Sequence, residues 1–179
     1  MHMIDKDKNN KFTKGEVLDT YMGIKDIKGY LGVKFNMALA CNYLELEKVA
    51  KELLLESERI QELIKPLESE RIEFAKNNAT KDKDGSPVIV NNVYQFTPEV
   101  KIKVDQFYES LKNVKYKTEW AKFEKESKDY NEELKAPVTT KFNLRMIEED
   151  WIPEDLKTEH FLVIANLIKF NTIAGTEKR

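Results

Sequence analysis

A hydrophobic heptad pattern over dozens of residues constrains the fold of this chain more than any other feature. From Val33 onward, apolar residues recur every three or four positions, and two polar residues occupy further stations of the same series: Phe35, Leu39, Asn42, Leu46, Val49, Leu53, Ser57, Ile60, Ile64 and Leu67. This spacing is typical of a coiled-coil seam, along which one long helix packs against another. The sequence therefore predicts a long helix over residues 33–78, with a kink or short break at Pro66.

The residues after this helix predict a β-hairpin. Lys81 to Pro87 is dense in turn-forming residues, so Asp82 and Asp84 are interpreted as part of a hairpin turn. Two β-rich runs, Val88–Val90 and Val93–Phe96, then flank Asn91-Asn92. Because asparagine tolerates positive φ, a tight two-residue turn is expected there.

A returning helix is predicted over residues 98–135. Thr97 is placed to cap it, and Pro98 occupies its first position. The apolar period slips across residues 112–115 and then resumes. Antiparallel packing against the first long helix is the expected result.

The two ends of the chain are predicted to form a small base. Thr13 and Glu16 have the spacing of a capping box at the start of a first helix. Alternating apolar and polar residues at 138–147 indicate a half-buried strand. Thr158 is expected to cap a last helix whose apolar face continues to Ile168.

Together these elements predict a mainly α fold in one domain, residues 1–179. A long antiparallel helical hairpin (33–78 and 98–135) carries a β-hairpin at its tip (79–97), and the base is α+β (1–32 and 136–170).

Charge and cysteine content exclude several functional classes. Lys and Arg number 30 against 32 Asp and Glu, and the two signs are interspersed, so no nucleic-acid or membrane partner is expected. The basic-aromatic stretch at 112–117 is followed by Glu119 and is interpreted as a solvated helix face. Cys41 is the one cysteine, which suits a reducing cytoplasm, and it is expected to be buried.

A resemblance adds a biological setting. The helix from about Gly15 to Ile27, the long charged helix, the Asp-rich turn at 81–88 and the short Tyr94-Gln95-Phe96 strand are similar to an uncharacterised family of small phage and prophage proteins of low-GC Gram-positive bacteria. The resemblance implies a phage protein acting in the cytoplasm of a host cell. It implies no activity and no functional residue.

One motif points to a metal. Residues 5–16 match an EF-hand calcium loop at most positions, with Asp5, Asp7, Asn9 and Glu16 as weak candidate ligands. Asn10 stands where the loop normally has Gly, and no entering helix is expected before Asp5. A polar tail followed by the capping box is the preferred interpretation, so no metal or cofactor is predicted.

The sequence favours protein binding over catalysis. His160 is interpreted as a structural histidine, and the sequence contains no nucleophile or phosphate-loop motif. We therefore do not expect the protein to be an enzyme. A non-enzymatic phage protein that binds a host or phage protein is expected. Alternatives are an inhibitor of a host defence complex and a small calcium-binding module. We expect Val88, Val90 and Val93 to contact the partner, because exposed apolar side chains and strand edges usually mark a contact site. The alternative is that both faces of the hairpin are covered, one by the kinked helix and the other by a second chain. Self-association of the protein is left open.

Overall fold

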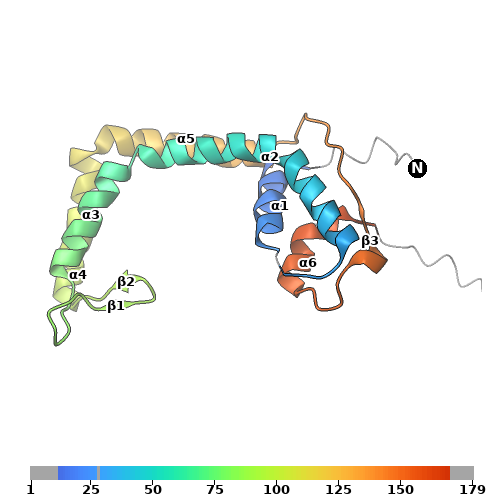
Figure 1. Cartoon of the computed structure of the whole chain (residues 1–179). Helices are drawn as coiled ribbons and strands as arrows, with labels where there is room; N and C mark the ends of the chain where they lie inside the picture. The colour runs from blue at the N-terminus through green and yellow to red at the C-terminus, as the bar shows by residue number, and fades with distance from the viewer. Residues whose placement is uncertain (1–11, 28, 170–179) are drawn as a thin grey trace, which may run out of the picture. The chain divides into compact units, whose positions relative to one another are not determined.

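The computed structural model describes residues 12–27 and 29–169, which divide into two compact units (Figure 1). One unit comprises residues 1–55 and 131–179, and the other comprises residues 56–130. The described residues form six α-helices, short 3₁₀ and π-helical turns, and two sheets of two strands each. The prediction of a mainly α protein is confirmed.

The predicted long helix is α2 (Val33–Glu62), and its buried face follows the heptad. Phe35, Asn42 and Leu46 are fully buried, and Leu53 and Ile60 are almost so. The predicted break is also present. Pro66 lies in the first turn of α3 (Lys65–Asn78). The N–H groups of a first turn have no acceptor within the helix, so the N–H that proline lacks removes no helical hydrogen bond there. A short turn through residues 63–64 separates the two helices.

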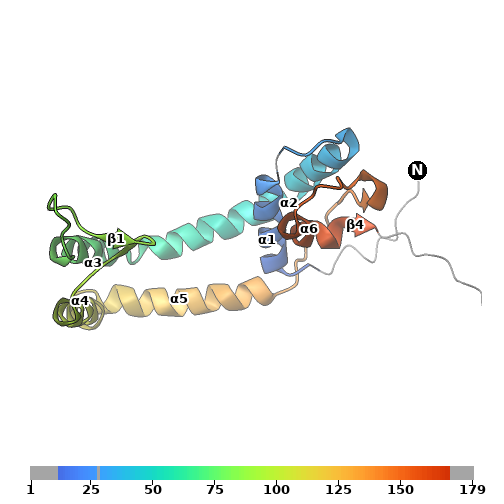
Figure 2. The ribbon, with the colours of Figure 1, turned by 90° about the horizontal axis from the view of Figure 1, so that it is seen from below.

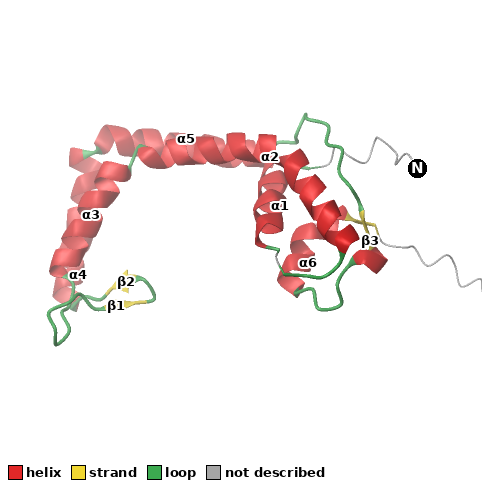
Figure 3. Cartoon of the chain, in the orientation of Figure 1, coloured by secondary structure: helices red, strands yellow, loops and turns green. Residues whose placement is uncertain are grey.

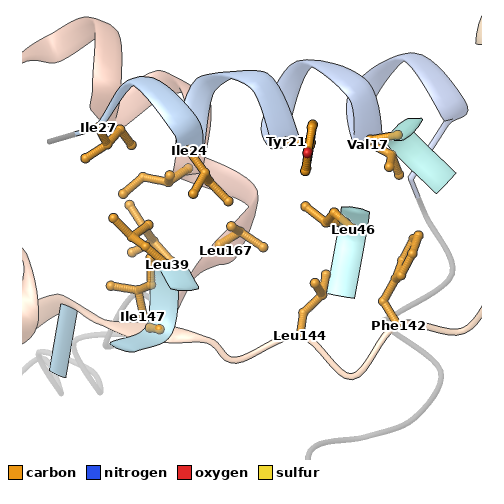
Figure 4. Packing of buried hydrophobic residues seen from close by; sticks show 14 of the residues in the cluster. Val17, Tyr21, Ile24, Ile27, Leu39, Leu46, Phe142, Leu144, Ile147 and Leu167 are labelled. Carbon is orange, nitrogen blue, oxygen red and sulfur yellow. The ribbon is translucent and has the colours of Figure 1, made fainter. Parts of the chain in front are cut away.

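In the first unit, α1 (Lys14–Asp26) and α6 (Thr158–Ile164) enclose a core with the N-terminal part of α2 (Figure 4). The figure shows apolar side chains converging from α1, from α2 and from the chain around Leu144. The predicted capping box starts α1, because the Thr13 hydroxyl accepts from the Glu16 N–H and the Glu16 carboxylate accepts from the Thr13 N–H. The Lys14 N–H at the start of α1 donates a hydrogen bond to the Ala136 C=O at 3.0 Å, which joins the chain at 136–138 to this helix.

The strand predicted over residues 138–147 is wrong for most of its length. Only β3 (Ile147–Glu148) is a strand, and it pairs in parallel with β4 (Ile168–Lys169). Burial nevertheless alternates as expected as far as Leu144, with Phe142 and Leu144 facing the core. Beyond it the alternation stops, because Arg145 and Met146 are both half-buried and Ile147 is buried. The extended backbone there bonds to side chains of α2 instead of a neighbouring strand.

The predicted cap of the last helix is also wrong. Thr158 is the first residue of α6, and Lys157 precedes it without a side-chain capping bond. The Tyr30 hydroxyl instead accepts from the N–H of Lys157, the residue at the N-cap, at 3.2 Å. The chain leaves α6 after Ile164 and turns through residues 165–167 into β4, so the predicted helix is shorter than its apolar pattern.

In the second unit, α3 packs antiparallel to α4 (Pro98–Ser110), and both views show the two helices side by side (Figure 2). The rings of Phe74 and Phe107 stack with centroids 4.0 Å apart. Further along the same unit, Arg59 of α2 pairs with Glu126 of α5 (Lys117–Lys135) at 2.8 Å. The antiparallel arrangement is therefore confirmed within residues 56–130.

The apolar period slips, as predicted, at a π-helical turn, Leu111–Lys115. The Tyr116 N–H bonds to the Leu111 C=O, five residues earlier, at 2.8 Å. A π turn accommodates one extra residue without ending the helix. It therefore brings the apolar faces of α4 and α5 back into phase.

Candidate protein-binding hairpin

The hairpin expected at the tip of the second unit is formed by β1 (Ile89–Val90) and β2 (Val93–Tyr94), shown as yellow arrows in Figure 3. Ile89 lies opposite Tyr94, and Val90 lies opposite Val93. Asn91 and Asn92 have φ values of 49° and 63°. A two-residue turn with both central residues at positive φ matches the right-handed twist of the strands, so the predicted turn is confirmed.

The Asp-rich segment before β1 is a second turn, as predicted. The Asp82 carboxylate accepts from the N–H groups of Asp84 and Ser86, each at 2.9 Å. Gly85 has a φ of +79°, which favours glycine. The Thr80 N–H bonds to the Gln95 C=O at 2.8 Å, and the Val88 N–H bonds to the Thr80 C=O at 2.8 Å. Backbone bonds thus hold the base of the hairpin.

Both faces of the hairpin expose apolar side chains. Val90 and Val93 share one face and are 51% and 59% exposed. Val88 lies on the same side and is half-buried. On the opposite face Ile89 is 54% exposed, while its partner Tyr94 is half-buried. Ile89 was not among the predicted contact residues, although strand alternation already placed it on the face opposite Val90.

The register also determines where backbone groups point. In a two-residue hairpin the residues that flank the turn, here Val90 and Val93, exchange hydrogen bonds, and Gln95 N–H bonds to Val88 C=O at 3.0 Å. Ile89 and Tyr94 are therefore the non-hydrogen-bonded pair, and their N–H and C=O groups point away from the partner strand. The hairpin thus offers apolar side chains on its faces and backbone groups along its edges.

The calcium candidates are not brought together by the part of the chain that the structure describes. Asp5, Asp7 and Asn9 lie outside the described residues, and Glu16 uses its carboxylate in the capping box with Thr13. Across residues 12–27 and 29–169, no group of three His, Cys, Asp or Glu side chains is placed to hold a metal ion.

His160 has the structural role that the sequence indicated. Its Nδ1 lies 3.0 Å from the Tyr30 hydroxyl, and the two rings meet edge to face. The same hydroxyl accepts from Lys157 N–H. The three groups join the start of α6 to the loop that precedes α2.

Within the basic-aromatic stretch at 112–117, Lys112 is more enclosed than expected. The Lys112 ammonium lies 4.6 Å from the Tyr108 ring centroid and 5.3 Å from that of Trp120, and it pairs with Glu109. Its side chain is only 17% exposed, which corrects the interpretation of a solvated face for this residue.

Neighbouring charges in this stretch are also paired within the second unit. Glu70 accepts from the Lys115 ammonium and from the Tyr116 hydroxyl, and these bonds lower the pKa of its carboxyl. These groups therefore stabilise contacts between α3 and the π-helical turn.

Cys41 is exposed on α2, so the expectation that it is buried is wrong. It lies in an apolar stretch of sequence, but the buried face of α2 passes through Ala38, Leu39 and Asn42 instead.

No family model, curated protein or solved structure matches this chain. None of the described helices has both the length and the apolar character needed to cross a bilayer.

Proposed function

We propose that this protein acts by binding another protein through the β1–β2 hairpin, without catalysing a reaction. The observation that carries the proposal is the exposure of Ile89, Val90 and Val93, each more than half accessible to solvent on a hairpin of only two short strands. Exposed apolar groups that cluster on one small element are typical of contact sites.

The hairpin is also well prepared to bind. Its turn, its register and the bonds at its base fix the apolar side chains in place before a partner arrives. A preorganised surface loses little conformational entropy on association, so more of the contact energy contributes to affinity.

The resemblance to phage proteins supplies the setting of this proposal. The partner would be a protein of the host or of the phage, met in the host cytoplasm, and inhibition of a host defence complex is the more specific form of the same role. No cofactor takes part in this mechanism.

The test compares two variants in the same unit. Val90→Ser with Val93→Ser removes the apolar face of the hairpin. Ile102→Ser is the matched control, because Ile102 of α4 is 58% exposed, close to the 59% of Val93. Affinity purification from host extract with each protein, followed by mass spectrometry, identifies candidate partners, and titration of the purified partner measures affinity.

We expect the double variant to bind at least about tenfold more weakly, as loss of central apolar contacts usually does, while both variants keep the wild-type melting temperature. Equal affinity of the double variant and the control would refute the proposal. A lowered melting temperature for the double variant alone would show that the valines are part of the folded core, and would refute it as well.

A further inference from the structure

Tyr21 of α1 and Tyr43 of α2 form a close tyrosine pair in the first unit. Their rings stack with centroids 4.5 Å apart and an interplanar angle of 18°, and their hydroxyl oxygens lie 2.8 Å apart. Because the two oxygens are closer together than the two ring centres, the rings converge toward their hydroxyl ends. The Cε carbons, which neighbour the hydroxyl group on each ring, therefore lie in the part of the stack where the rings are closest.

The two tyrosines differ in their access to solvent. Tyr21 is 4% exposed and projects from α1 into the core of the unit (Figure 4). Tyr43 is half-buried and packs against the edge of the same core. The hydrogen bond to Tyr43 and burial raise the pKa of Tyr21 to about 12, so Tyr21 keeps its phenolic proton at neutral pH. A dissolved oxidant therefore meets this pair at Tyr43.

The geometry of the pair suits one reaction of tyrosine in particular. Loss of one electron and the phenolic proton leaves a radical whose unpaired electron is shared between the oxygen and the ring, including the Cε carbons. Two such radicals couple through Cε carbons to give dityrosine. Free tyrosines must first collide, whereas the rings of Tyr21 and Tyr43 are already stacked at contact distance. Fixed proximity of this kind raises the rate of a bimolecular step by several orders of magnitude.

We propose that the Tyr21–Tyr43 pair is an oxidative modification site, at which a one-electron oxidant joins α1 to α2 through a dityrosine cross-link. The two residues are 22 positions apart, so the link closes a loop that stays closed in the unfolded chain. The pair belongs to the first unit and the β1–β2 hairpin to the second. The modification therefore does not depend on the proposed partner of the hairpin.

The hydrogen bond between the hydroxyls gives the buried ring a path to its radical. The oxidant first takes one electron from Tyr43, whose phenolic proton leaves to water. Tyr21 then transfers its hydroxyl hydrogen atom across the 2.8 Å bond, which restores the Tyr43 phenol and leaves the radical on Tyr21. A second oxidation of Tyr43 gives two adjacent radicals, and a Cε–Cε bond forms between them. The hydrogen on each coupled carbon moves to its phenolic oxygen. The protein has then lost two hydrogen atoms in all, as two electrons to the oxidant and two protons to water.

Photo-oxidation of the purified full chain tests the proposal. Light, ruthenium tris(bipyridyl) and persulfate supply a one-electron oxidant, and persulfate takes up the two electrons and becomes sulfate. Dilute protein keeps links between molecules rare. After reduction and digestion with trypsin, mass spectrometry should find the peptide that contains Tyr21 joined to the peptide that contains Tyr43. The joined mass should be lower than the sum of the two peptides by two hydrogen atoms.

Two variants and one solvent condition separate the pair from general tyrosine oxidation. Tyr21→Phe keeps a ring in the stack but cannot form a phenoxyl radical, so it should abolish the link. Tyr116→Phe is the control and should leave the yield unchanged, because Tyr116 is also half-buried but bonds to Glu70 at 2.6 Å instead of to a tyrosine. Unfolding the wild type in urea separates the rings and should lower the yield at least about tenfold.

The urea measurement uses the wild-type sequence, so it remains decisive if Tyr21→Phe folds poorly. Equal yields of the Tyr21–Tyr43 link in native and unfolded protein would overturn the inference. Native protein whose tyrosines are oxidised without forming this link would overturn it as well.

Discussion

The side chain of Asn42 and the backbone of Arg145 form two hydrogen bonds in the core of the first unit. The Asn42 Nδ2 donates to the Arg145 C=O at 2.9 Å, and the Arg145 N–H donates to the Asn42 Oδ1 at 2.6 Å. Asn42 is completely buried. An extended segment without a neighbouring strand is thus satisfied by an amide that mimics a strand partner.

Replacing Asn42 with Leu should destabilise the protein, although leucine is the better residue for a helical seam. The change leaves the N–H and C=O of Arg145 buried without their partner, which we expect to cost about 2–4 kcal/mol of unfolding free energy. Urea denaturation measures the loss. Asn36→Ala is the control on the same helix, because the exposed Asn36 amide makes one bond to Tyr30 C=O and should cost less than about 1 kcal/mol. A urea midpoint that rises in the Asn42→Leu variant would contradict this account.

Gly23 should not tolerate alanine. In an unconstrained helix, Gly→Ala usually stabilises by about 0.5–1 kcal/mol. Here a Cβ on α1 would lie 2.2 Å from the Cγ1 and 2.7 Å from the Cγ2 of Val163 on α6. We therefore expect Gly23→Ala to destabilise by about 1–3 kcal/mol. Adding Val163→Ala should recover part of the loss, and a double-mutant cycle by thermal melting measures the coupling. Additive effects of the two changes would contradict close packing of α1 on α6.

The Tyr21 hydroxyl should stay protonated in the native protein at pH values where free tyrosine ionises. Its hydrogen bond with Tyr43, at 2.8 Å, and its burial raise the pKa of Tyr21 to about 12. Because the folded pKa exceeds the unfolded value of about 10, this contribution to stability is fully present below pH 10 and is lost as pH rises through 12.

NMR of ¹³C-labelled tyrosine across about pH 9–12, assigned with Tyr21→Phe, measures this pKa. Tyr43→Phe should lower it, because the hydrogen bond is its largest cause. A Tyr21 pKa near 10 in the native protein would refute the expectation.

Local elements were predictable because their signals lie within a few residues. The capping box of Thr13 and Glu16, the helix start at Thr97-Pro98 and the turn at Asn91-Asn92 follow from backbone preferences of those residues. The slip at 112–115 was likewise readable as a change of phase, although the period alone did not indicate that it would be a π turn.

The sequence by itself determined the helices, their buried seam and the hairpin, since periodicity and turn chemistry are local. Tertiary structure decided what satisfied the backbone near Arg145. It also decided that Tyr30 would cover the start of α6. These last two outcomes depend on contacts between residues more than a hundred positions apart, and a heptad pattern carries no information about which distant segment will meet it.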